Sequence, residues 1–330
     1  MTTWTHLAEV CPLPPELWPA GAGGGYRIRY RDSGRVSSGS VFLPAGEPAS
    51  MPLLTWAHCF VGLDRHSAPS VCGLPRVERE HLSGWLARGF AVAAADFKGL
   101  DGCGLSPFPG THQIAADLMG ICPAARELDE RIEKTVLAGG FCQGGRAALH
   151  AAHPGFELNY KGAVALAPPD YLPYFTEVTA DADRPADALI LVLLAGMRGT
   201  DASFRPEDFL TRTGAECLSA ITSLSVRQMR ELLAPYTVGD LGVHRVAART
   251  PVTAALTRCR SLPPTPTKSF LVCTIEADPV SPPASAARSC AQLAGNGAEV
   301  VHRTYTGGAH MDVLGLAAAD VLEWAVEHAV

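Results

Sequence analysis

Short apolar runs alternate with segments of helical periodicity along most of the chain. The pattern predicts strands at 41–44, 51–58, 89–96, 135–140, 162–168, 270–275 and 298–305, and helices at 77–88, 114–132 and 284–295, directly after residue 142 and from about residue 312. Buried strands of four to eight residues that alternate with helices are typical of a mostly parallel sheet covered by helices. The pattern therefore predicts an α/β fold.

The alternation stops after the strand at 162–168, where the chain becomes mostly helical, in stretches such as AECLSAITSLSVRQMRELLAPY. A proline-rich connector, SLPPTPTKS, then leads back to a strand. We expect one core made of residues 1–170 and 266–330, with residues 171–265 inserted as a helical cap over the mouth of an active site. A second domain without a catalytic part is the alternative.

Composition excludes several classes of function. The chain has 330 residues, of which 18% are charged, and a net charge of −6, whereas nucleic-acid-binding proteins usually carry a basic face. No window reaches the roughly eighteen uninterrupted apolar residues of a membrane span. The first residues show no cationic stretch followed by an apolar one, so we expect no secretion signal and a cytoplasmic location. The expected partner is a hydrophobic small molecule, with the oligomeric state left open.

The ten cysteines form no CxxC pair, which together with the missing signal indicates a reducing compartment. Most of them are expected to be small core residues, such as Cys273 in FLVCTI. No Cys/His pairs lie at the spacing of zinc ligands, so neither a metal nor a cofactor is predicted. His150 and His153 are close to a helix end, where we expect a structural role.

One cysteine has a different setting. The segment GGFCQGGRAAL places Cys142 between glycines, where a strand turns into an alanine-rich helix. The apex of such a turn is strained, and its neighbours two positions away must be small. Gly140 and Gly144 occupy these positions, and Gly145 allows close packing. We expect the Cys142 sulfur to project beyond the strand ends at a helix N-terminus, where the helix dipole lowers a thiol pKa. A turn built for packing alone is the alternative.

Two later segments supply partners for this cysteine. An acid after a later strand and a histidine near the C-terminus, in that order, would complete a catalytic triad. Asp278 follows a strand in FLVCTIEADPVSPP, and His310 lies in the glycine-rich loop of TYTGGAHMDV. We therefore predict the triad Cys142, Asp278 and His310. Glu276 is the alternative acid, expected to face solvent or a helix because it belongs to the strand end.

Several segments resemble the secretory-lipase family of α/β-hydrolases. WAHCFVGLDRHSAPS is similar to the HGTxGxxxxCAPS segment of that family, and GFAVAAADFKGL is similar to its GYAVVAPDYxGLG. PAARE and FELNYKGAVALAPPDYL also match. The resemblance covers most of the chain from about residue 50. It implies an α/β-hydrolase core, a helical cap and cleavage of esters of apolar compounds.

Three positions depart from the pattern of that family. Cys142 stands where the family has its nucleophilic serine, Cys59 replaces the glycine of HGT, and Ser67 replaces the cysteine of CAPS. The last difference is consistent with an intracellular relative. The cysteine elbow also resembles the GxCxGG motif of dienelactone hydrolase, an enzyme that lacks a large cap, so this second resemblance is local.

The predicted triad implies a definite mechanism. His310 would take the thiol proton, Asp278 would orient the imidazole, and the sulfur would attack the carbonyl of an ester, thioester or lactone. The oxyanion would accept hydrogen bonds from the amide of Gln143 and from that of Phe60 or Cys59.

Two further polar residues, His58 and Asp96, lie at strand ends beside this site. Each could shape a loop or touch the substrate. A cysteine nucleophile gives a thioester intermediate, which amines and alcohols accept readily, so both hydrolysis and acyl transfer are open.

Two other classes of function stay open. A Cys–His pair can move a proton without covalent chemistry, as in a lyase that eliminates acetate from an acetylated tetronate in polyketide-type natural-product biosynthesis. A non-catalytic binding scaffold is the third class. The apolar cap segment DALILVLLAGM favours a hydrophobic substrate, although such a run is also typical of a core.

Overall fold

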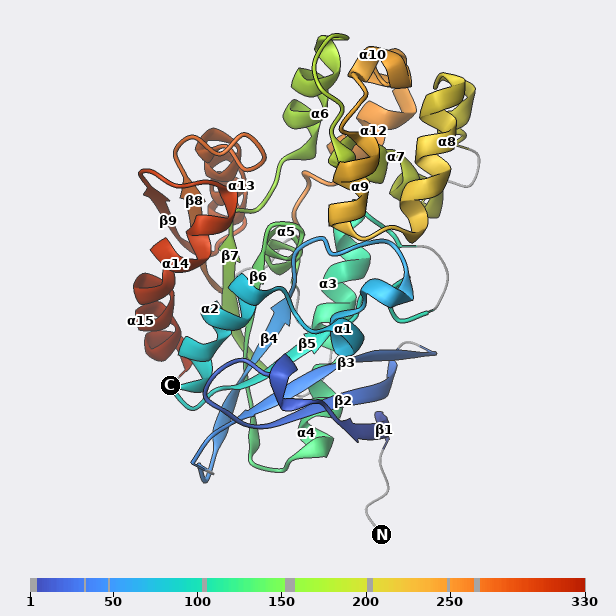
Figure 1. Ribbon diagram of the computed structural model, residues 1–330. Coiled ribbons are helices and arrows are strands. Elements are labelled where there is room, and N and C mark those ends of the chain that lie inside the picture. Colours follow the sequence, from blue (N-terminus) through green and yellow to red (C-terminus); the bar gives the residue numbers. More distant parts are fainter. Residues whose placement is uncertain are drawn as a thin grey trace.

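The described part of the chain forms one nine-stranded sheet in this computed structural model (Figure 1). The structure describes residues 5–32, 34–46, 48–102, 106–151, 158–200, 204–247, 250–263 and 268–329. In their order across the sheet, the strands are β1 (Leu7–Pro12), β2 (Ala22–Asp32), β3 (Arg35–Pro44), β5 (Ala91–Ala95), β4 (Met51–Ala57), β6 (Ile132–Phe141), β7 (Asn159–Leu166), β8 (Ser269–Ile275) and β9 (Glu299–Tyr305). Neighbours from β5 to β9 in this order are parallel, whereas β1, β2, β3 and β5 pair antiparallel. The predicted α/β fold with a mostly parallel sheet is confirmed.

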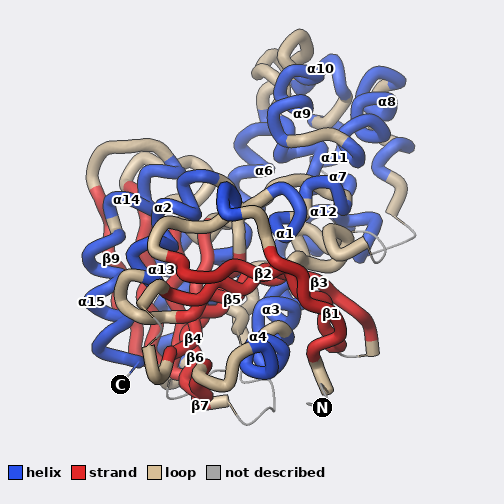
Figure 2. The backbone as a smooth tube through the Cα atoms, turned by 60° about the horizontal axis from the view of Figure 1, so that its bottom comes forward, coloured by secondary structure: helices blue, strands red, loops and turns tan. Residues whose placement is uncertain are grey.

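The antiparallel strands β1 to β3 extend the sheet on one side (Figure 2). The hydrophobic pattern predicts only the last four residues of β3. In strand β2, exposed arginines alternate with buried residues such as Ile28 and Tyr30. The glycines at the start of the strand have no side chains, so the alternation of apolar and polar residues is not visible there in the sequence. Strand β3 buries serines instead of apolar residues, Ser38 among them. Polar side chains that are buried by partners distant in the sequence leave no hydrophobic signal.

Helices cover both faces of the sheet. One face packs against α2 (Arg76–Leu86), α14 (Val313–Leu316) and α15 (Ala318–Ala329), and the other packs against α3 (Thr111–Gly120), α4 (Cys122–Leu128), α5 (Gln143–Leu149) and α13 (Pro283–Gly295). The helix predicted at 114–132 is wrong as a single element, because Pro123 lies in the first turn of a new helix, α4, and lacks an N–H group to continue the previous one. In the part of the chain that the structure describes, no helix is long and apolar enough to cross a membrane.

The regular elements described between β7 and β8 are all helices. They are α6 (Tyr171–Ala180), α7 (Ala188–Thr200), α8 (Arg212–Ala220), α9 (Val226–Leu233), α10 (Val238–Leu241), α11 (His244–Ala247) and α12 (Thr250–Arg258). Figure 1 shows them grouped beyond the end of the sheet toward which β4, β6 and β7 point. They enclose an apolar core of their own, and residues 190–194 of α7 are at most 1% exposed. The apolar run DALILVLLAGM is therefore a packing segment of the cap.

The shorter helical elements lie mostly in loops. They are α1 (Pro69–Cys72) and the 3-10 turns Pro15–Leu17, Arg65–Ser67, Pro206–Asp208, Ile221–Ser223 and His310–Asp312. The last of these turns contains the predicted catalytic histidine.

Cys273 and His150, which were predicted to be structural, are both buried. The nine described cysteines are all free thiols, and Cys273 is completely buried in β8. His150 lies 3.1 Å from the Thr111 hydroxyl through Nε2, and burial lowers its pKa to about 3. These contacts are those of a neutral core histidine. His153 lies outside the described residues.

Candidate active site

Cys142 occupies the sharp turn between β6 and α5. Its backbone has φ 54° and ψ −119°, and among the described residues other than glycine only Ala167 also has a positive φ. The Cys142 amide donates a 2.9 Å hydrogen bond to the Leu166 carbonyl, which ties the turn to the end of β7. A backbone conformation of this kind persists only where the surrounding structure holds it. The turn therefore places the thiol at the carboxyl ends of the parallel strands.

Three glycines around Cys142 allow this turn. A Cβ atom on Gly144 would overlap the carbonyl oxygen of Ala57, and one on Gly140 would overlap the backbone of Gly144. A Cβ atom on Gly145 would lie 2.5 Å from the carbonyl oxygen of Leu166. Each obstacle is backbone, which cannot move aside as a flexible side chain can. The glycine pattern seen in the sequence thus corresponds to close packing of α5 on β4, β6 and β7.

His310 and Asp278 are in direct contact. His310 Nδ1 lies 2.5 Å from Asp278 Oδ2, and Asp278 Oδ1 accepts backbone hydrogen bonds from Val280 (2.9 Å) and Ser281 (3.1 Å). Burial acts to raise the pKa of Asp278, but the hydrogen bonds from His310 and the two amides outweigh it and hold the pKa below its usual range. The alternative acid, Glu276, is exposed.

The other ring nitrogen of His310 faces the Cys142 turn. Its Nε2 atom is buried and makes no hydrogen bond among the described residues, and the ring lies 5.1 Å from that of Phe141, the residue before Cys142. Burial acts to lower the pKa of His310, but the charge of the Cys142 sulfur and the hydrogen bond with Asp278 outweigh it and raise the pKa to about 10. The imidazole therefore lies between a sulfur and a carboxylate, and both favour its protonated form.

Of the two oxyanion donors expected in the loop after β4, the Phe60 amide is available and the Cys59 amide is not. The Cys59 amide donates to Glu78 Oε1 at 3.0 Å, so the expectation that it could bind an oxyanion is corrected. The amides of Phe60 and Gln143 make no hydrogen bond with the described residues. Gln143 begins α5, where backbone N–H groups are free for a ligand. These two amides are the donors that remain.

Glu78 is a site residue that the sequence analysis missed. It is completely buried in α2, and its second oxygen, Oε2, accepts a 2.5 Å hydrogen bond from Trp56 Nε1. Burial raises the pKa of Glu78 to about 6, against the hydrogen bonds from Cys59 and Trp56 that favour the charged form. A signal was present: Glu78 lies three, four and seven positions before the buried residues His81, Leu82 and Trp85, on the apolar face of the helix.

His58 and Asp96 direct their hydrogen bonds to the loops around the site. His58 is 1% exposed, its Nδ1 lies 2.7 Å from the Cys59 carbonyl, and its ring stacks on Phe97 at 4.1 Å. Burial lowers the pKa of His58 to about 4, so the ring is neutral and Nδ1 donates its proton to the carbonyl. Of the two roles considered for His58, these contacts belong to loop shaping.

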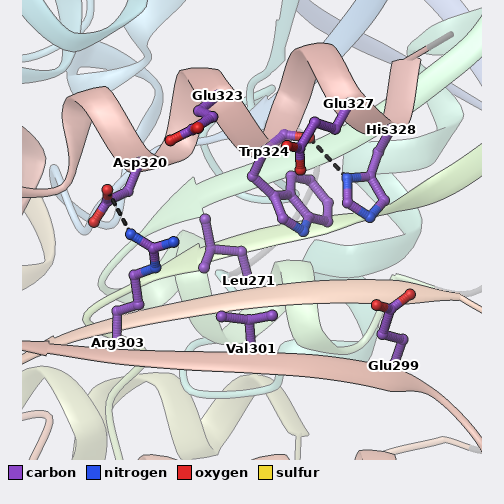
Figure 3. A pocket seen from close by; sticks show the side chains of 9 residues that line it. All are labelled: Leu271, Glu299, Val301, Arg303, Asp320, Glu323, Trp324, Glu327 and His328. Carbon is purple, nitrogen blue, oxygen red and sulfur yellow. Dashed lines mark hydrogen bonds and ion pairs between the residues drawn. The ribbon is translucent and has the colours of Figure 1, made fainter.

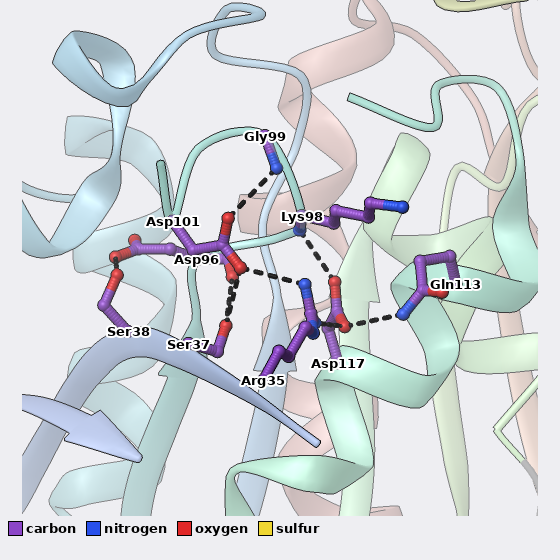
Figure 4. Close-up of polar contacts among 9 residues, drawn as sticks. All are labelled: Arg35, Ser37, Ser38, Asp96, Lys98, Gly99, Asp101, Gln113 and Asp117. Atoms are coloured by element: carbon purple, nitrogen blue, oxygen red, sulfur yellow. Dashed lines mark hydrogen bonds and ion pairs between the residues drawn. The ribbon is translucent and has the colours of Figure 1, made fainter. Parts of the chain in front are cut away.

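Asp96 holds the start of α1 against β3. Its carboxylate accepts hydrogen bonds from the hydroxyls of Ser70 and Ser38, the latter at 2.7 Å, and from the Ser70 amide at 3.0 Å. Figure 4 shows the Ser38 contact beside a second network, in which Arg35 bridges Asp101 and Asp117. Both networks fix loops at the carboxyl end of β5.

An aromatic row lies beside Cys142. The rings of Phe60 and Phe108 are 5.3 Å apart, and Phe108 meets Tyr171 edge to face at 5.3 Å. Tyr171, the first residue of α6, is 4% exposed, and its pKa is raised by burial and then by the nearby Cys142 sulfur. The cap approaches closely here, because a Cβ atom on Gly196 of α7 would overlap the carbonyl oxygen of Phe108. On this side of the thiol, the surroundings are therefore aromatic and adjoin the helices α6 and α7.

A cavity elsewhere in the structure is not lined by Cys142, Asp278 or His310. It has a volume of about 200 Å³ and lies between β9 and α15 (Figure 3). Its lining includes Leu271, Glu299, Val301, Arg303, Asp320, Glu323, Trp324, Glu327 and His328, and Arg303 forms a 2.5 Å ion pair with Asp320. Within the described ranges, no group of three or more histidine, cysteine, aspartate or glutamate side chains is arranged to hold a metal ion.

Comparison with known proteins gives similarity at the level of the fold. No protein-family model and no curated protein matches the sequence. The structure of Candida antarctica lipase A in its closed state superimposes with a TM-score of 0.78 at 16% identity, over 98% of this chain and 81% of that chain. The rice cell wall degrading esterase LipA from Xanthomonas oryzae gives 0.72 at 17% identity, over 97% of both chains. A putative hydrolase from Legionella pneumophila gives 0.74 at 15% identity, over 97% of this chain and 98% of that chain. The chain thus has the α/β-hydrolase fold.

Proposed function

We propose that this protein is an esterase or acyltransferase that uses Cys142 to attack an ester, thioester or lactone of a hydrophobic compound. The main support is the position of His310, which contacts Asp278 through Nδ1 and leaves a buried Nε2 beside the Cys142 turn. A thiol, an acid and an imidazole in this chain order match the arrangement of α/β-hydrolase triads. The names of two similar structures, a lipase and an esterase, agree with this class of reaction by analogy of fold alone.

In the proposed reaction, the sulfur attacks the carbonyl carbon and a C–S bond forms. The carbonyl oxygen becomes an oxyanion that accepts hydrogen bonds from the Gln143 and Phe60 amides. His310 then donates its Nε2 proton to the leaving alcohol as the C–O bond breaks, which leaves a thioester on Cys142. Water or a second alcohol gives its proton to His310 and attacks the thioester, and the C–S bond breaks. Asp278 keeps the imidazole oriented throughout.

The surroundings favour an apolar acyl group. Phe60, Phe108 and Tyr171 present three aromatic rings in a row, and the cap covers this region through α6 and α7. Apolar walls with few polar groups are typical of sites for hydrophobic small molecules. A hydrophobic substrate is therefore the proposed ligand.

Trapping the thioester tests the proposal. With an activated aryl ester, whose leaving group needs no proton, His310→Ala is expected to accumulate an acyl mass on the peptide that contains Cys142, because the base for the second step is gone. Intact-protein and peptide mass spectrometry would detect it. Turnover by Cys142→Ala, with no adduct in either variant, would contradict covalent catalysis. An alkene product without solvent oxygen would instead indicate elimination.

Glu78→Gln is expected to lower kcat by about 10- to 100-fold with KM within about twofold, because one lost oxyanion donor costs about 2.7–4 kcal/mol and a displaced donor costs part of that. The glutamate oxygens each accept one N–H group, from Cys59 and Trp56. Glutamine has one acceptor, so its NH₂ group would face an N–H donor and shift the loop that carries Phe60. Steady-state kinetics measure both constants.

The same variant is expected to change the pH dependence of stability. The pKa of Glu78 is about 6 in the folded protein, above the ordinary value of 4.5, so its stabilising contribution is complete below pH 4.5 and is lost as the pH rises through 6. Relative to wild type, Glu78→Gln should therefore gain about 2 kcal/mol between pH 4.5 and pH 7.5. Glu80→Gln, an exposed site on the same helix, is the control and should change neither kinetics nor this difference. Equal behaviour of the two variants would contradict a role for Glu78 in the loop.

A further inference from the structure

Among the described residues, three arginines meet one aspartate where the cap joins the core. Arg146 belongs to α5, Arg260 follows α12, and Arg288 belongs to α13. Asp170 Oδ2 pairs with Arg260 at 3.2 Å and with Arg288 at 3.0 Å. These four residues line a cavity of about 190 Å³, together with Ser285, Ser289 and Gln292. If each arginine and the aspartate are charged, the lining carries two excess positive charges.

Arg146 has no negative partner of its own. It is 5% exposed, and within the described ranges no carboxylate lies at ion-pair distance from it. Its guanidinium donates only to neutral oxygens, the Cys259 carbonyl at 3.1 and 2.8 Å and the Ser289 hydroxyl at 2.8 Å. Asp170 acts on the Arg146 charge electrostatically, but its carboxylate already pairs with Arg260 and Arg288, so the buried charge of Arg146 is incompletely compensated. An anion in the cavity would supply the missing charge.

The polar atoms of the cavity restrict the kind of anion. Guanidinium and hydroxyl donors suit the oxygens of phosphate, but Asp170 Oδ1 is buried and has no hydrogen-bond partner among the described residues. This oxygen needs a donor. A phosphate that keeps one proton offers acceptors to the arginines and a hydroxyl to Asp170, whereas sulfate has no proton to donate at neutral pH.

Size and access also agree with such a ligand. One water needs only about 10–15 Å³ of accessible space, so a cavity of about 190 Å³ has room for a larger group. The Arg260 and Arg288 side chains are 35% and 54% exposed, which leaves an entrance from solvent.

We propose that this cavity is a binding site for a phosphate-type oxyanion that keeps one proton, either free phosphate or the phosphate group of a larger molecule. The site lies at both chain crossings between core and cap. Asp170 directly precedes the first cap helix, whereas Cys259 and Arg260 follow the last one. A bound anion would link these crossings to α5 and α13, and so stabilise the cap on the core. The site is separate from the proposed catalytic residues, and does not depend on their role.

Titration of the full-length protein with phosphate and with sulfate, at matched ionic strength and pH 6.5, tests the proposal. Phosphate is expected to bind saturably by calorimetry and to raise the melting temperature by a few degrees at about 100 times its Kd, since a ligand of the folded state stabilises it by mass action. Sulfate should bind at least about 10-fold more weakly, because it leaves Asp170 Oδ1 without a donor. Glycerol 3-phosphate distinguishes the two sources: binding by it indicates an ester-borne phosphate, and binding by inorganic phosphate alone indicates the free ion.

Two variants locate the effect. Arg288→Gln, at a partly exposed position, should weaken phosphate binding about 10-fold or more through the loss of a charge-assisted hydrogen bond. Asp170→Asn should remove the preference for phosphate over sulfate. Arg76→Gln makes the same charge change at an exposed position on α2 and should bind phosphate as wild type does. Equal, non-saturating effects of phosphate and sulfate, or an equal loss in Arg76→Gln and Arg288→Gln, would overturn the proposal.

Discussion

Asp278→Asn is expected to lower kcat/KM for an activated ester by about a thousandfold or more. The reason lies in the two backbone amides, of Val280 and Ser281, that donate to Asp278 Oδ1. An asparagine keeps its oxygen on these amides and so turns its NH₂ group toward His310 Nδ1. The imidazole must then carry its proton on Nε2, where it can no longer accept one. The pKa of His310 also loses a contribution that helps to raise it to about 10.

Glu276→Gln is the matched control for this variant, since it removes a carboxylate two residues away that is exposed. Its kcat/KM is expected to stay within about twofold of wild type, as for most exposed substitutions. Steady-state kinetics over pH 5 to 9 compare the two. If Asp278→Asn keeps activity within tenfold while circular dichroism shows a native fold, the amide does not turn as described and the orienting role of Asp278 is wrong. A larger loss in Glu276→Gln would identify the other acid.

The sequence predicts those parts of the site that are set by local backbone geometry. The glycines around Cys142 are informative because a single turn, closed within six residues, requires all of them. Asp278 and His310 could be expected near Cys142 for a related reason, since each lies in the loop after a strand and parallel strands bring their carboxyl ends to one edge. The same rule of alternation predicts the parallel strands and most helices that cover them.

Features that depend on contacts distant in sequence were not predictable in the same way. The sequence gives no reason to distinguish the Cys59 amide from the Phe60 amide as an oxyanion donor. Only the position of α2 in the structure shows that the Cys59 amide already donates a hydrogen bond to Glu78. Tyr171 stands near Cys142 because the cap begins there, and no local pattern reveals this proximity. The first half of strand β3 buries Ser37 and Ser38, whose hydroxyls donate to Asp101 and Asp96, so it lacks the apolar signature of a strand. Each of these features depends on a contact between segments that are distant in the sequence.

The loop after β4 and helix α5 meet at Gly144, and this contact connects the fold with the proposed chemistry. Its missing side chain allows α5 to approach the carbonyls of Ala57 and His58, and a Cβ atom on the glycine would lie 2.8 Å from the His58 carbonyl oxygen. The two proposed oxyanion donors, Gln143 and Phe60, belong to the two backbone segments on either side of this contact. Their spacing is therefore set by backbone packing rather than by flexible side chains, which keeps the donors in place during the reaction.

Gly144→Ala is accordingly expected to destabilise the protein by about 3 kcal/mol or more, at the upper end of the cost of overpacking, because the added methyl group meets the backbone of Ala57 and His58. It should also lower kcat through displacement of the donors. Gly295→Ala, on the exposed end of α13 with open space around the new Cβ atom, is the control and should be neutral or stabilising by up to about 1 kcal/mol. Urea denaturation measures both changes. A Gly144→Ala variant within 1 kcal/mol of wild type would mean that α5 and the loop after β4 are not packed this closely, and the spacing proposed for the oxyanion donors would lose its physical basis.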